Sequence, residues 1–415
     1  MATQDACQPD RDDASRFRLM PASIQRCFAV TAPGIEAITA AELAALGLAP
    51  LETEPGGVTF DATPDQLYLA NLELRTASRI TVRVAEFPAR AFYELERKAG
   101  RVPWGAFLKP GTPVRFRVTS KKSRLYHADA IVQRLQAIAG GTPAASEHAE
   151  GGDSPAREED EGPDPPESEV RLFIVRVLRD IVTISADSSG ALLHRRGYRL
   201  EGGKAPLRET FAAAMLMRAG YDGTAPLADP FCGSGTIPIE AAMLARRMAP
   251  GLNRSFAFEG WPDFDANAWG ALRGRAMERI LPAAAADIAG SDRDAGAIAS
   301  AAANAERAGV ARDIRFEVAA VSSVKPPAGP GLLATNPPYG VRVGRAGDLR
   351  DLYARLGTLL RERWNEWNVA LLVTGSMPER EMGLPFAPGW ASSNGGIPIR
   401  LLLRGRPDAG AGSAG

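Results

Sequence analysis

The segment PLADPFCGSGTI, residues 226–237, combines a short apolar run, an aspartate and two glycines. The run before Asp229 predicts a buried strand, and residues 237–247 carry apolar side chains at helical spacing. Gly233 and Gly235 lack a Cβ atom, so the loop backbone can approach a ligand closely. The predicted helix also offers free N–H groups at its N-terminus to a carboxylate. We therefore predict a ligand-binding loop; the alternative is a tight turn without a ligand.

Strands and helices alternate around this loop through most of the second half of the chain. This alternation predicts an α/β fold with a doubly wound, mostly parallel, Rossmann-like sheet. Ligands bind such sheets at the carboxyl ends of the strands. Further strands are expected at 288–292, 313–320, 332–335 and 368–374, and helices at 207–219, 295–308 and 349–364.

An aspartate, Asp292, ends the strand predicted after the glycine loop. A carboxylate in this place can accept hydrogen bonds from both hydroxyls of a ribose. The alternative is that Asp292 caps the next helix, a role that Asp294 could equally fill.

The tetrapeptide Asn336-Pro337-Pro338-Tyr339 directly follows another predicted buried strand. The prolines lack N–H groups and fix the backbone, so the asparagine oxygen and nearby carbonyls can point outward as acceptors. An exocyclic base amine offers two donors to such acceptors, and a tyrosine ring can stack on the base. A proline-rich surface loop is the alternative, although a buried strand rarely leads into one.

The first 140 residues mix strands and helices in an α+β pattern. Residues 140–169 interrupt it with ten carboxylates, one arginine and almost no large apolar side chain. Such a stretch cannot bury enough surface to offset its ordering entropy, which predicts a disordered insertion; an acidic binding segment is the alternative. Residues 170–177 and 181–185 can pair as a hairpin, so the insertion lies within a domain.

Basic residues gather in two places, although the 49 Lys and Arg residues equal the 49 Asp and Glu residues in number. Basic side chains with aromatics among them suit phosphate contacts and base stacking; the alternative is a solvated charged face. Phe116 and Tyr126 lie within the first group, and Tyr198 within the second. The candidate nucleic-acid contacts are Arg115, Arg117, Lys121, Lys122, Arg124, Arg195 and Arg196.

The three cysteines, Cys7, Cys27 and Cys232, show no paired spacing, so neither a metal site nor a disulfide framework is expected. No apolar run reaches the roughly 18 residues of a membrane span, and the N-terminus lacks a signal-peptide pattern. We expect a cytoplasmic protein with no membrane partner.

Together these segments resemble a known family. Residues 229–236, Asp292 and residues 336–339 resemble the motifs of class I amino-group methyltransferases. Residues 204–210 (KAPLRET), residues 249–258 with Trp261, and the N-terminal residues 28–47 are similar to segments of THUMP-domain RNA guanine-N2 methyltransferases. The resemblance extends from about residue 26 to 405.

The resemblance implies methyl transfer from S-adenosylmethionine to guanine N2 in ribosomal or transfer RNA. We expect ribosomal RNA before transfer RNA as the partner, and a monomer. Asn336, Pro337, Pro338 and Tyr339 would form the catalytic site. The implied cofactor contacts are Glu209, Thr210, Asp229, Phe231, Cys232, Gly233, Ser234, Gly235, Thr236, Asp292, Arg293 and Asn336.

The implied organisation has two terminal tails and three ordered parts. The tails, 1–24 and 406–415, are expected to be disordered. The ordered parts are a ferredoxin-like segment at 25–65, a THUMP-like domain at 66–190 and a methyltransferase domain at 191–405.

Two other functions stay open. The tetrapeptide also fits an adenine-N6 methyltransferase acting on RNA. Small residues at 319–320 stand where the family often has an adenine-binding carboxylate, which leaves open a non-catalytic RNA-binding protein of ribosome assembly.

Overall fold

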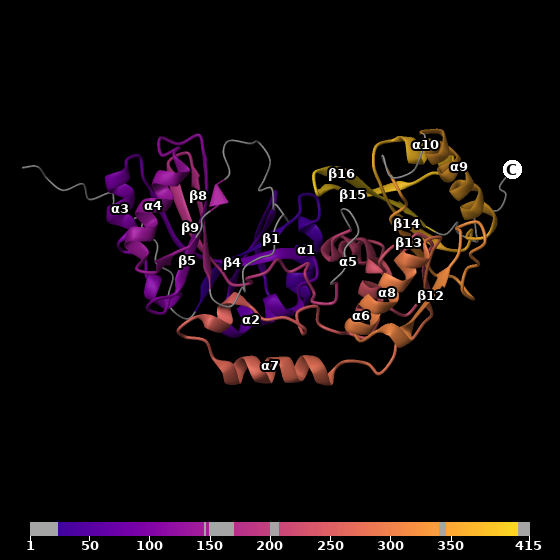
Figure 1. The fold of residues 1–415 in the computed structure, drawn as a ribbon, viewed down its shortest axis with the longest axis horizontal. Helices are drawn as coiled ribbons and strands as arrows, with labels where there is room; N and C mark the ends of the chain where they lie inside the picture. Colours follow the sequence, from indigo (N-terminus) through magenta and orange to yellow (C-terminus); the bar gives the residue numbers. More distant parts are fainter. Residues whose placement is uncertain (1–23, 145–146, 149–169, 200–206, 340–345, 406–415) are drawn as a thin grey trace, which may run out of the picture.

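The structure is a computed structural model that describes residues 24–144, 147–148, 170–199, 207–339 and 346–405. Two domains lie side by side, the N-terminal one in indigo and magenta and the C-terminal one in orange and yellow (Figure 1). The predicted tails fall almost wholly outside the described residues.

The N-terminal domain is built on a nine-stranded sheet of order β2-β3-β1-β4-β9-β8-β5-β6, with β7 also paired to β5. The strands are β1 (Gln25–Thr31), β2 (Pro50–Glu54), β3 (Gly57–Ala62), β4 (Ala77–Pro88), β5 (Pro113–Lys121), β6 (Thr142–Pro143), β7 (Glu147–His148), β8 (Arg171–Leu178) and β9 (Ile181–Asp187). The helices are α1 (Glu36–Ala45), α2 (Pro64–Glu73), α3 (Phe92–Ala99), η2 (Trp104–Ala106) and α4 (Ala128–Ala139).

One strand, β4, joins the parts predicted to be ferredoxin-like and THUMP-like. Its first half pairs with β1 and its second half with β9, both antiparallel. Twelve residues give β4 the length for both partners. The two parts, which the sequence separates near residue 65, therefore share a continuous sheet.

The hairpin predicted on either side of residue 180 is confirmed, since β8 and β9 pair antiparallel in register from Phe173 to Ile181. The start of the insertion differs from the expectation of disorder at 140–169. Residues 142–143 and 147–148 pair with β5, and Thr142 N–H donates to Thr112 O at 3.1 Å. Backbone hydrogen bonds form this pairing without large apolar side chains. Residues 149–169 lie outside the described part of the chain.

The C-terminal domain is built on a seven-stranded sheet of order β12-β11-β10-β13-β14-β16-β15. The first five of these strands are parallel, and β16 and β15 are antiparallel to their neighbours. This confirms the predicted doubly wound, mostly parallel sheet. The strands are β10 (Leu227–Asp229), β11 (Ile288–Asp292), β12 (Ile314–Val318), β13 (Leu332–Thr335), β14 (Asn368–Val373), β15 (Ala387–Asn394) and β16 (Ile397–Arg404).

Helices α5 (Glu209–Arg218), α6 (Thr236–Ala245), α8 (Ala295–Arg307) and α9 (Ala346–Glu362) all match predicted helices closely. The sequence patterns missed the hairpin β15–β16 and two helices, α7 (Ala266–Glu278) and α10 (Met377–Met382). Short 3-10 turns lie at η3 (Ala257–Gly260) and η4 (Ala311–Asp313).

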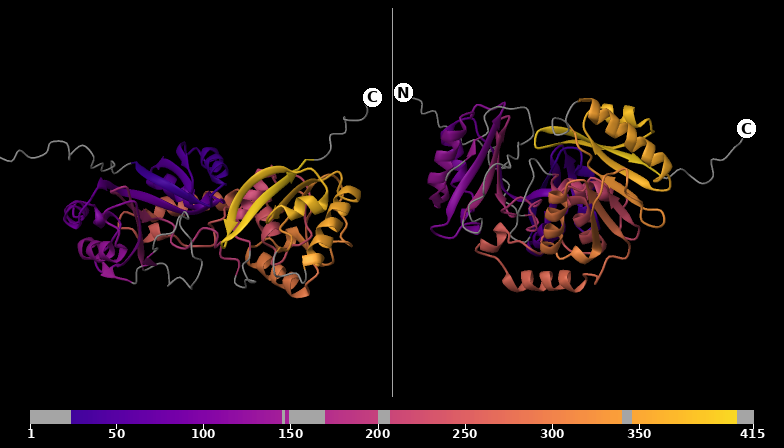
Figure 2. Two further views of the ribbon diagram at one scale, coloured as in Figure 1. Left: turned by 90° about the horizontal axis from the view of Figure 1, so that it is seen from above. Right: turned by 45° about the vertical axis from the view of Figure 1, so that its right-hand side comes forward.

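The segment between α6 and β11 crosses from the C-terminal domain to the N-terminal one, where α7 lies below α2 (Figures 1 and 2). Its aromatic side chains enter the N-terminal core. The Tyr68 ring of α2 stacks on Phe258 at 4.5 Å between ring centroids, and Trp269 meets Phe258 edge-on at 5.2 Å. In return Ile35, next to α1, is fully buried in the core of the C-terminal domain. The two domains therefore exchange core residues.

Candidate active site

The glycine loop connects β10 to α6 at the carboxyl edge of the sheet. Gly233 and Gly235 both have positive φ, 51° and 85°, so each adopts the left-handed conformation that favours glycine. A Cβ atom on Gly235 would lie 3.0 Å from the Ala301 Cβ atom. Within the described residues no side chain caps α6, which begins at Thr236, so its first N–H groups remain available to an anion.

Asp229, the last residue of β10, is buried at 2% exposure beneath this loop. Its Oδ1 atom accepts hydrogen bonds from the Phe231 N–H at 3.1 Å and the Thr335 hydroxyl at 2.5 Å. Burial raises the pKa of Asp229 to about 7, and the charge of Asp292 adds to the rise, against these two hydrogen bonds. The site therefore holds a carboxyl group that titrates near neutral pH.

Asp292 ends β11 and faces the same loop. Its Oδ2 atom accepts from the Gly233 N–H at 3.1 Å, and its Oδ1 atom from the Asp294 N–H at 3.0 Å. Asp294 caps α8, because its side chain accepts from the N–H groups of Gly296 and Ala297. Asp292 is thus not the helix cap, and the geometry favours its prediction as a ligand contact.

The tetrapeptide follows β13 on the other side of β10. Asn336 lies directly after Thr335, and its Oδ1 atom is buried without a hydrogen-bond partner among the described residues. The Pro338 carbonyl accepts from the Tyr353 hydroxyl of α9 at 3.3 Å, which holds the turn in place. A buried acceptor with no internal partner suits a donor that arrives from outside, such as an amine.

Glu209 and Thr210, at the start of α5, are buried at 2% and 3% exposure. The Glu209 Oε1 atom lies 3.2 Å from the Arg199 guanidinium, and its Oε2 atom has no hydrogen-bond partner among the described residues. Burial raises the pKa of Glu209, and the Arg199 charge lowers it. Their burial near the first turn of α6 fits the predicted cofactor contact.

The remaining predicted cofactor residues surround the glycine loop. The Cys232 N–H donates to the Ser291 carbonyl at 2.9 Å, and the Asn304 side chain donates to the Ser234 carbonyl at 3.0 Å. Phe231 is half-buried and Arg293 is exposed. The loop is therefore held from both β11 and α8.

Two partners of this site escaped the sequence-based prediction, Thr335 beside Asp229 and Asn304 beside Ser234. Both are fully buried. The position of Thr335 immediately before the tetrapeptide is the one signal that could have revealed it.

After β12, the third strand, the site has no carboxylate at its rim. The Ala319 N–H donates to the Asp292 carbonyl at 2.9 Å, and the neighbouring Ala320 is exposed. Glu317, on β12 itself, is also exposed. At this position the chain thus has a main-chain hydrogen bond to Asp292, and no acidic side chain, as the sequence indicates.

The predicted RNA contacts lie in two different environments. Lys121, at the end of β5, and Lys122 and Arg124, in the connection from β5 to α4, are exposed. Arg115 and Arg117 share one face of β5 and are half-buried, as their alternation predicts.

The two predicted contacts from the second basic group, Arg195 and Arg196, are not exposed as the loop residues are. Arg195 is half-buried, whereas Arg196 is buried at 2% exposure with its Nε atom 3.6 Å from Glu240. The prediction of an RNA contact therefore does not fit Arg196, because basic spacing alone cannot tell a surface cation from a buried ion pair.

Within the described part of the chain, no group of His, Cys, Asp and Glu side chains could hold a metal ion. Nor does any helix there combine the length and apolar character that a bilayer crossing needs.

A doubly wound sheet with a glycine loop, a second-strand aspartate and an Asn-Pro-Pro-Tyr turn at one edge defines a class I methyltransferase. Residues 196–388 match the family model described as "RMKL-like, methyltransferase domain", and residues 26–81 match that of the "RlmL ferredoxin-like domain". A "Putative RNA methyltransferase" of Synechocystis is 32% identical over 392 residues, which cover 94% of this chain and 98% of the relative. The chain belongs to this RMKL-like methyltransferase family.

A longer relative and a solved structure agree with the assignment. The "Ribosomal RNA large subunit methyltransferase K/L" of Syntrophotalea carbinolica is 36% identical over 90% of this chain, which spans 53% of that protein. The crystal structure of a "putative methyltransferase complexed with SAH" is 29% identical with a TM-score of 0.79, covering 93% of this chain and 99% of that one. S-adenosylmethionine is accordingly the cofactor of this family.

Proposed function

We propose that this chain methylates the exocyclic N2 atom of a guanosine in RNA, with ribosomal RNA as the preferred substrate over transfer RNA. The observation that carries transfer to a base amine is the Asn336 Oδ1 atom, a buried acceptor without a hydrogen-bond partner among the described residues, beside the carboxyl ends of β10 and β13. The family resemblance selects guanine N2 among such amines. The names of the relatives support RNA as the substrate, and the K/L relative supports ribosomal RNA.

The residues present fit S-adenosylmethionine. The free first turn of α6 suits the carboxylate of its methionine part, and the buried Glu209 carboxylate suits the ammonium group. Asp292 suits the ribose hydroxyls. When bound, S-adenosylmethionine supplies an electrophilic methyl group on a sulfonium that leaves as a neutral thioether.

The chain's own contribution to the transfer is positional. Asn336 Oδ1 and the adjacent main-chain carbonyls accept the two hydrogens of the base amine and hold its nitrogen toward the methyl carbon. With the cofactor bound, the base nitrogen held by Asn336 would take the methyl group as the sulfur departs as a thioether, and water would accept the extra proton from the nitrogen afterwards, so no strong base is needed. Tyr339 is half-buried after the two prolines and can stack on the base plane.

A loop surface of the N-terminal domain suits the RNA backbone. We name it the basic loop, consisting of Lys121, Lys122, Arg124, Tyr126 and His127. The Tyr126 and His127 rings lie 4.0 Å apart between centroids, and Tyr126 is 68% exposed, so this pair offers an open face for base stacking.

The turn between β8 and β9 organises the basic loop and adds cations to it. Asp180 accepts from the Arg124 N–H at 2.8 Å and lies 3.3 Å from the Arg90 Nε atom. The Arg179 N–H donates to the Lys121 carbonyl at 3.2 Å. Arg90 and Arg179, both exposed, are neighbours that the sequence-based prediction did not include.

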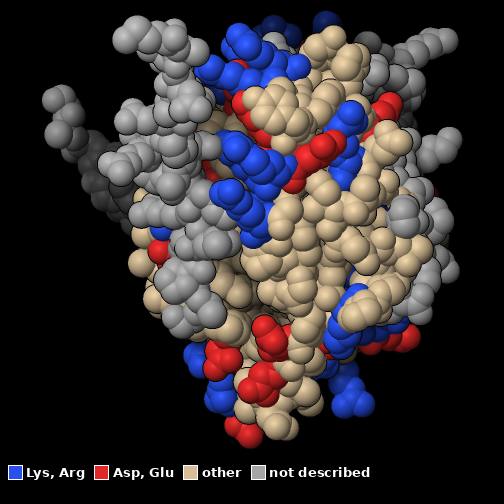
Figure 3. All heavy atoms as spheres, turned by 90° about the vertical axis from the view of Figure 1, so that its left-hand side faces the viewer, with Lys and Arg blue, Asp and Glu red and all other residues tan. Residues whose placement is uncertain are grey.

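The helical end of the same domain looks different. The end of the molecule formed by α3 and α4 carries Lys and Arg interspersed with Asp and Glu (Figure 3). Mixed charge of this kind attracts phosphate weakly, so the proposal rests on the grouped cations of the basic loop and not on this end of the molecule as a whole.

The decisive experiment is nucleoside mass spectrometry of ribosomal and transfer RNA from a strain that lacks the gene. N2-methylguanosine should disappear from one site and return with the wild-type gene. An unchanged guanosine profile with loss of N6-methyladenosine would replace this proposal by adenine-N6 methylation.

Cofactor binding is tested separately by calorimetry with S-adenosylmethionine. Absence of binding at millimolar cofactor would contradict catalysis and leave RNA binding as the function.

A further inference from the structure

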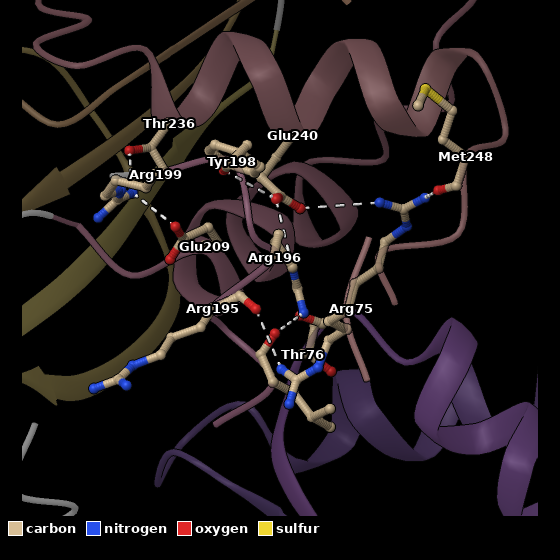
Figure 4. A network of polar contacts seen from close by, with 12 residues as sticks. Arg75, Thr76, Arg195, Arg196, Tyr198, Arg199, Glu209, Thr236, Glu240 and Met248 are labelled. Atoms are coloured by element: carbon tan, nitrogen blue, oxygen red, sulfur yellow. Dashed lines mark hydrogen bonds and ion pairs between the residues drawn. The ribbon is translucent and has the colours of Figure 1, made fainter. Parts of the chain in front are cut away.

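A buried polar network joins the two domains around Glu240 of α6 (Figure 4). The Glu240 side chain has no exposed surface, and its oxygens lie 3.9 Å from Arg75 and 3.6 Å from Arg196. The Tyr198 hydroxyl also donates to Glu240 at 3.2 Å. Arg75 belongs to the N-terminal domain, between α2 and β4, whereas Arg196 and Tyr198 belong to the segment that enters the methyltransferase domain.

Main-chain carbonyls fix the two arginines of this network. The Arg196 guanidinium donates to the carbonyls of Arg75 and Leu193, both at 2.5 Å, and the Arg75 guanidinium donates to the Met248 carbonyl. A buried charge without these partners would be strongly unfavourable, so the segment has little freedom to shift.

Arg199 follows this anchored segment and reaches the cofactor loop. Its Nη2 atom donates to the Thr236 hydroxyl at 2.6 Å and to the Leu207 carbonyl at 2.9 Å. The same atom lies 3.2 Å from Glu209 Oε1. Because Thr236 begins α6 and Glu209 begins α5, one guanidinium connects the first turns of both helices.

We propose that Arg199 is a positioning residue for S-adenosylmethionine: its guanidinium aligns the Glu209 carboxylate with the first turn of α6. The segment that carries Arg199 is itself held in place by Glu240. The proposal rests on the proposed cofactor contacts of Glu209 and the glycine loop. Glu209 Oε1 is turned to Arg199, which leaves the Oε2 atom, without a partner in the described part of the chain, for the cofactor's ammonium group.

The charge of Arg199 also favours the ionised form of Glu209, which can accept hydrogen bonds from an ammonium group. The charged and titratable groups that face Glu209 are Arg199, His194 and Tyr198 from the connecting segment and Glu240 from α6. Burial raises the pKa of Glu209 and Glu240 adds to the rise, whereas Arg199 and then His194 lower it. Without Arg199 the pKa of Glu209 would rise further, and a protonated carboxyl binds an ammonium group poorly.

The test is calorimetry with S-adenosylhomocysteine on the full chain carrying Arg199→Gln, from pH 6.5 to pH 8.5. Its Kd should exceed the wild-type Kd, and the ratio of the two should grow as the pH falls, because a higher pKa leaves more of the Glu209 carboxyl protonated. The KM for S-adenosylmethionine should rise while the Kd for RNA stays at the wild-type value. Arg199→Lys should restore much of the affinity, since it keeps the charge.

Two further variants separate the possible outcomes. Arg218→Gln, at the exposed far end of α5, should bind as the wild type does. In the double variant Arg199→Gln with Glu209→Gln, the extra pH dependence should vanish, because position 209 no longer carries a carboxyl group.

A wild-type Kd in Arg199→Gln would overturn the positioning role while leaving the proposed function intact, whereas a raised but pH-independent Kd would assign the role to alignment of Glu209 and not to its protonation. Absence of binding by the wild type would instead reject the proposed function. Melting curves without cofactor identify a variant that fails to fold, and Arg199→Lys then carries the test.

Discussion

The Thr335 hydroxyl at the end of β13 donates a hydrogen bond of 2.5 Å to the Asp229 carboxylate at the end of β10. This bond ties the glycine loop to the tetrapeptide, because Asn336 follows Thr335 directly. It also favours the ionised form of Asp229, whose pKa burial raises to about 7. Thr335→Val removes the donor with little change in side-chain shape.

We expect Thr335→Val to raise the pKa of Asp229 by about one unit. If the ionised carboxylate is the form that the cofactor requires, S-adenosylhomocysteine affinity should fall as the pH drops through about 7 in the wild type, and at a higher pH in the variant. Calorimetry between pH 6 and 9 measures both midpoints. Coincident midpoints would show that this hydrogen bond does not control the titration.

Asp229→Asn should change the pH dependence of stability in the cofactor-free protein. The pKa of Asp229 is raised in the folded state, so its contribution to stability is complete at low pH and is lost as the pH rises through about 7. The variant, which does not titrate, should therefore gain more in Tm over the wild type at pH 8 than at pH 5. Thermal melts at both values check this, with the exposed Asp263→Asn as the control.

Asn336→Ala should reduce kcat by about 100- to 1000-fold, the usual effect of removing one positioned polar group from a reaction centre. Because the side chain is expected to hold the base, the Kd for S-adenosylhomocysteine should change far less. Single-turnover kinetics and calorimetry separate the two effects. A large rise in the cofactor Kd with a normal kcat would assign Asn336 to cofactor binding alone.

The combined variant Lys121→Ala, Lys122→Ala and Arg124→Ala should weaken RNA binding without altering cofactor affinity. Each lost phosphate contact should also reduce the slope of log K against log salt by about one. Filter binding at several salt concentrations measures this slope. The control is Arg312→Ala, because Arg312 is exposed just before β12, at the amino end of the strands and away from the site. An equal loss of RNA binding in this variant would show a nonspecific effect of charge.

Trp269→Ala should destabilise the protein by about 3–5 kcal/mol, as is typical for loss of a large buried aromatic side chain. Trp269 is 5% exposed and contacts Phe256 and Phe258 at centroid distances of 5.6 and 5.2 Å. Urea unfolding gives the change. Met277→Ala, on the same helix but 59% exposed, should have little effect.

The parts of the site that local sequence could predict are those set by local chemistry. Positive φ angles require glycine at positions 233 and 235. Asp292 is recognisable because it ends a strand, and the tetrapeptide because of its two prolines. These requirements involve few neighbours, so they are visible in short segments.

The parts that could not be predicted depend on residues distant in the sequence. Arg196 has the spacing of a surface cation, yet Glu240, 44 positions later, makes it part of a buried pair. Helix α7 has few buried side chains, only Trp269 and Ala276, so its apolar periodicity is weak. The continuous sheet through β4 likewise depends on pairing between β4 and β9, about one hundred residues apart.

The exchange of core residues between the domains has a consequence for the proposed RNA complex. Ile35 is packed in the methyltransferase core, and Trp269 in the N-terminal core, so hinge motion would have to open both. We therefore expect the distance between the basic loop and Asn336 to stay fixed. The target nucleotide would then have to lie at a fixed distance, in the folded RNA, from the segment that binds the basic loop.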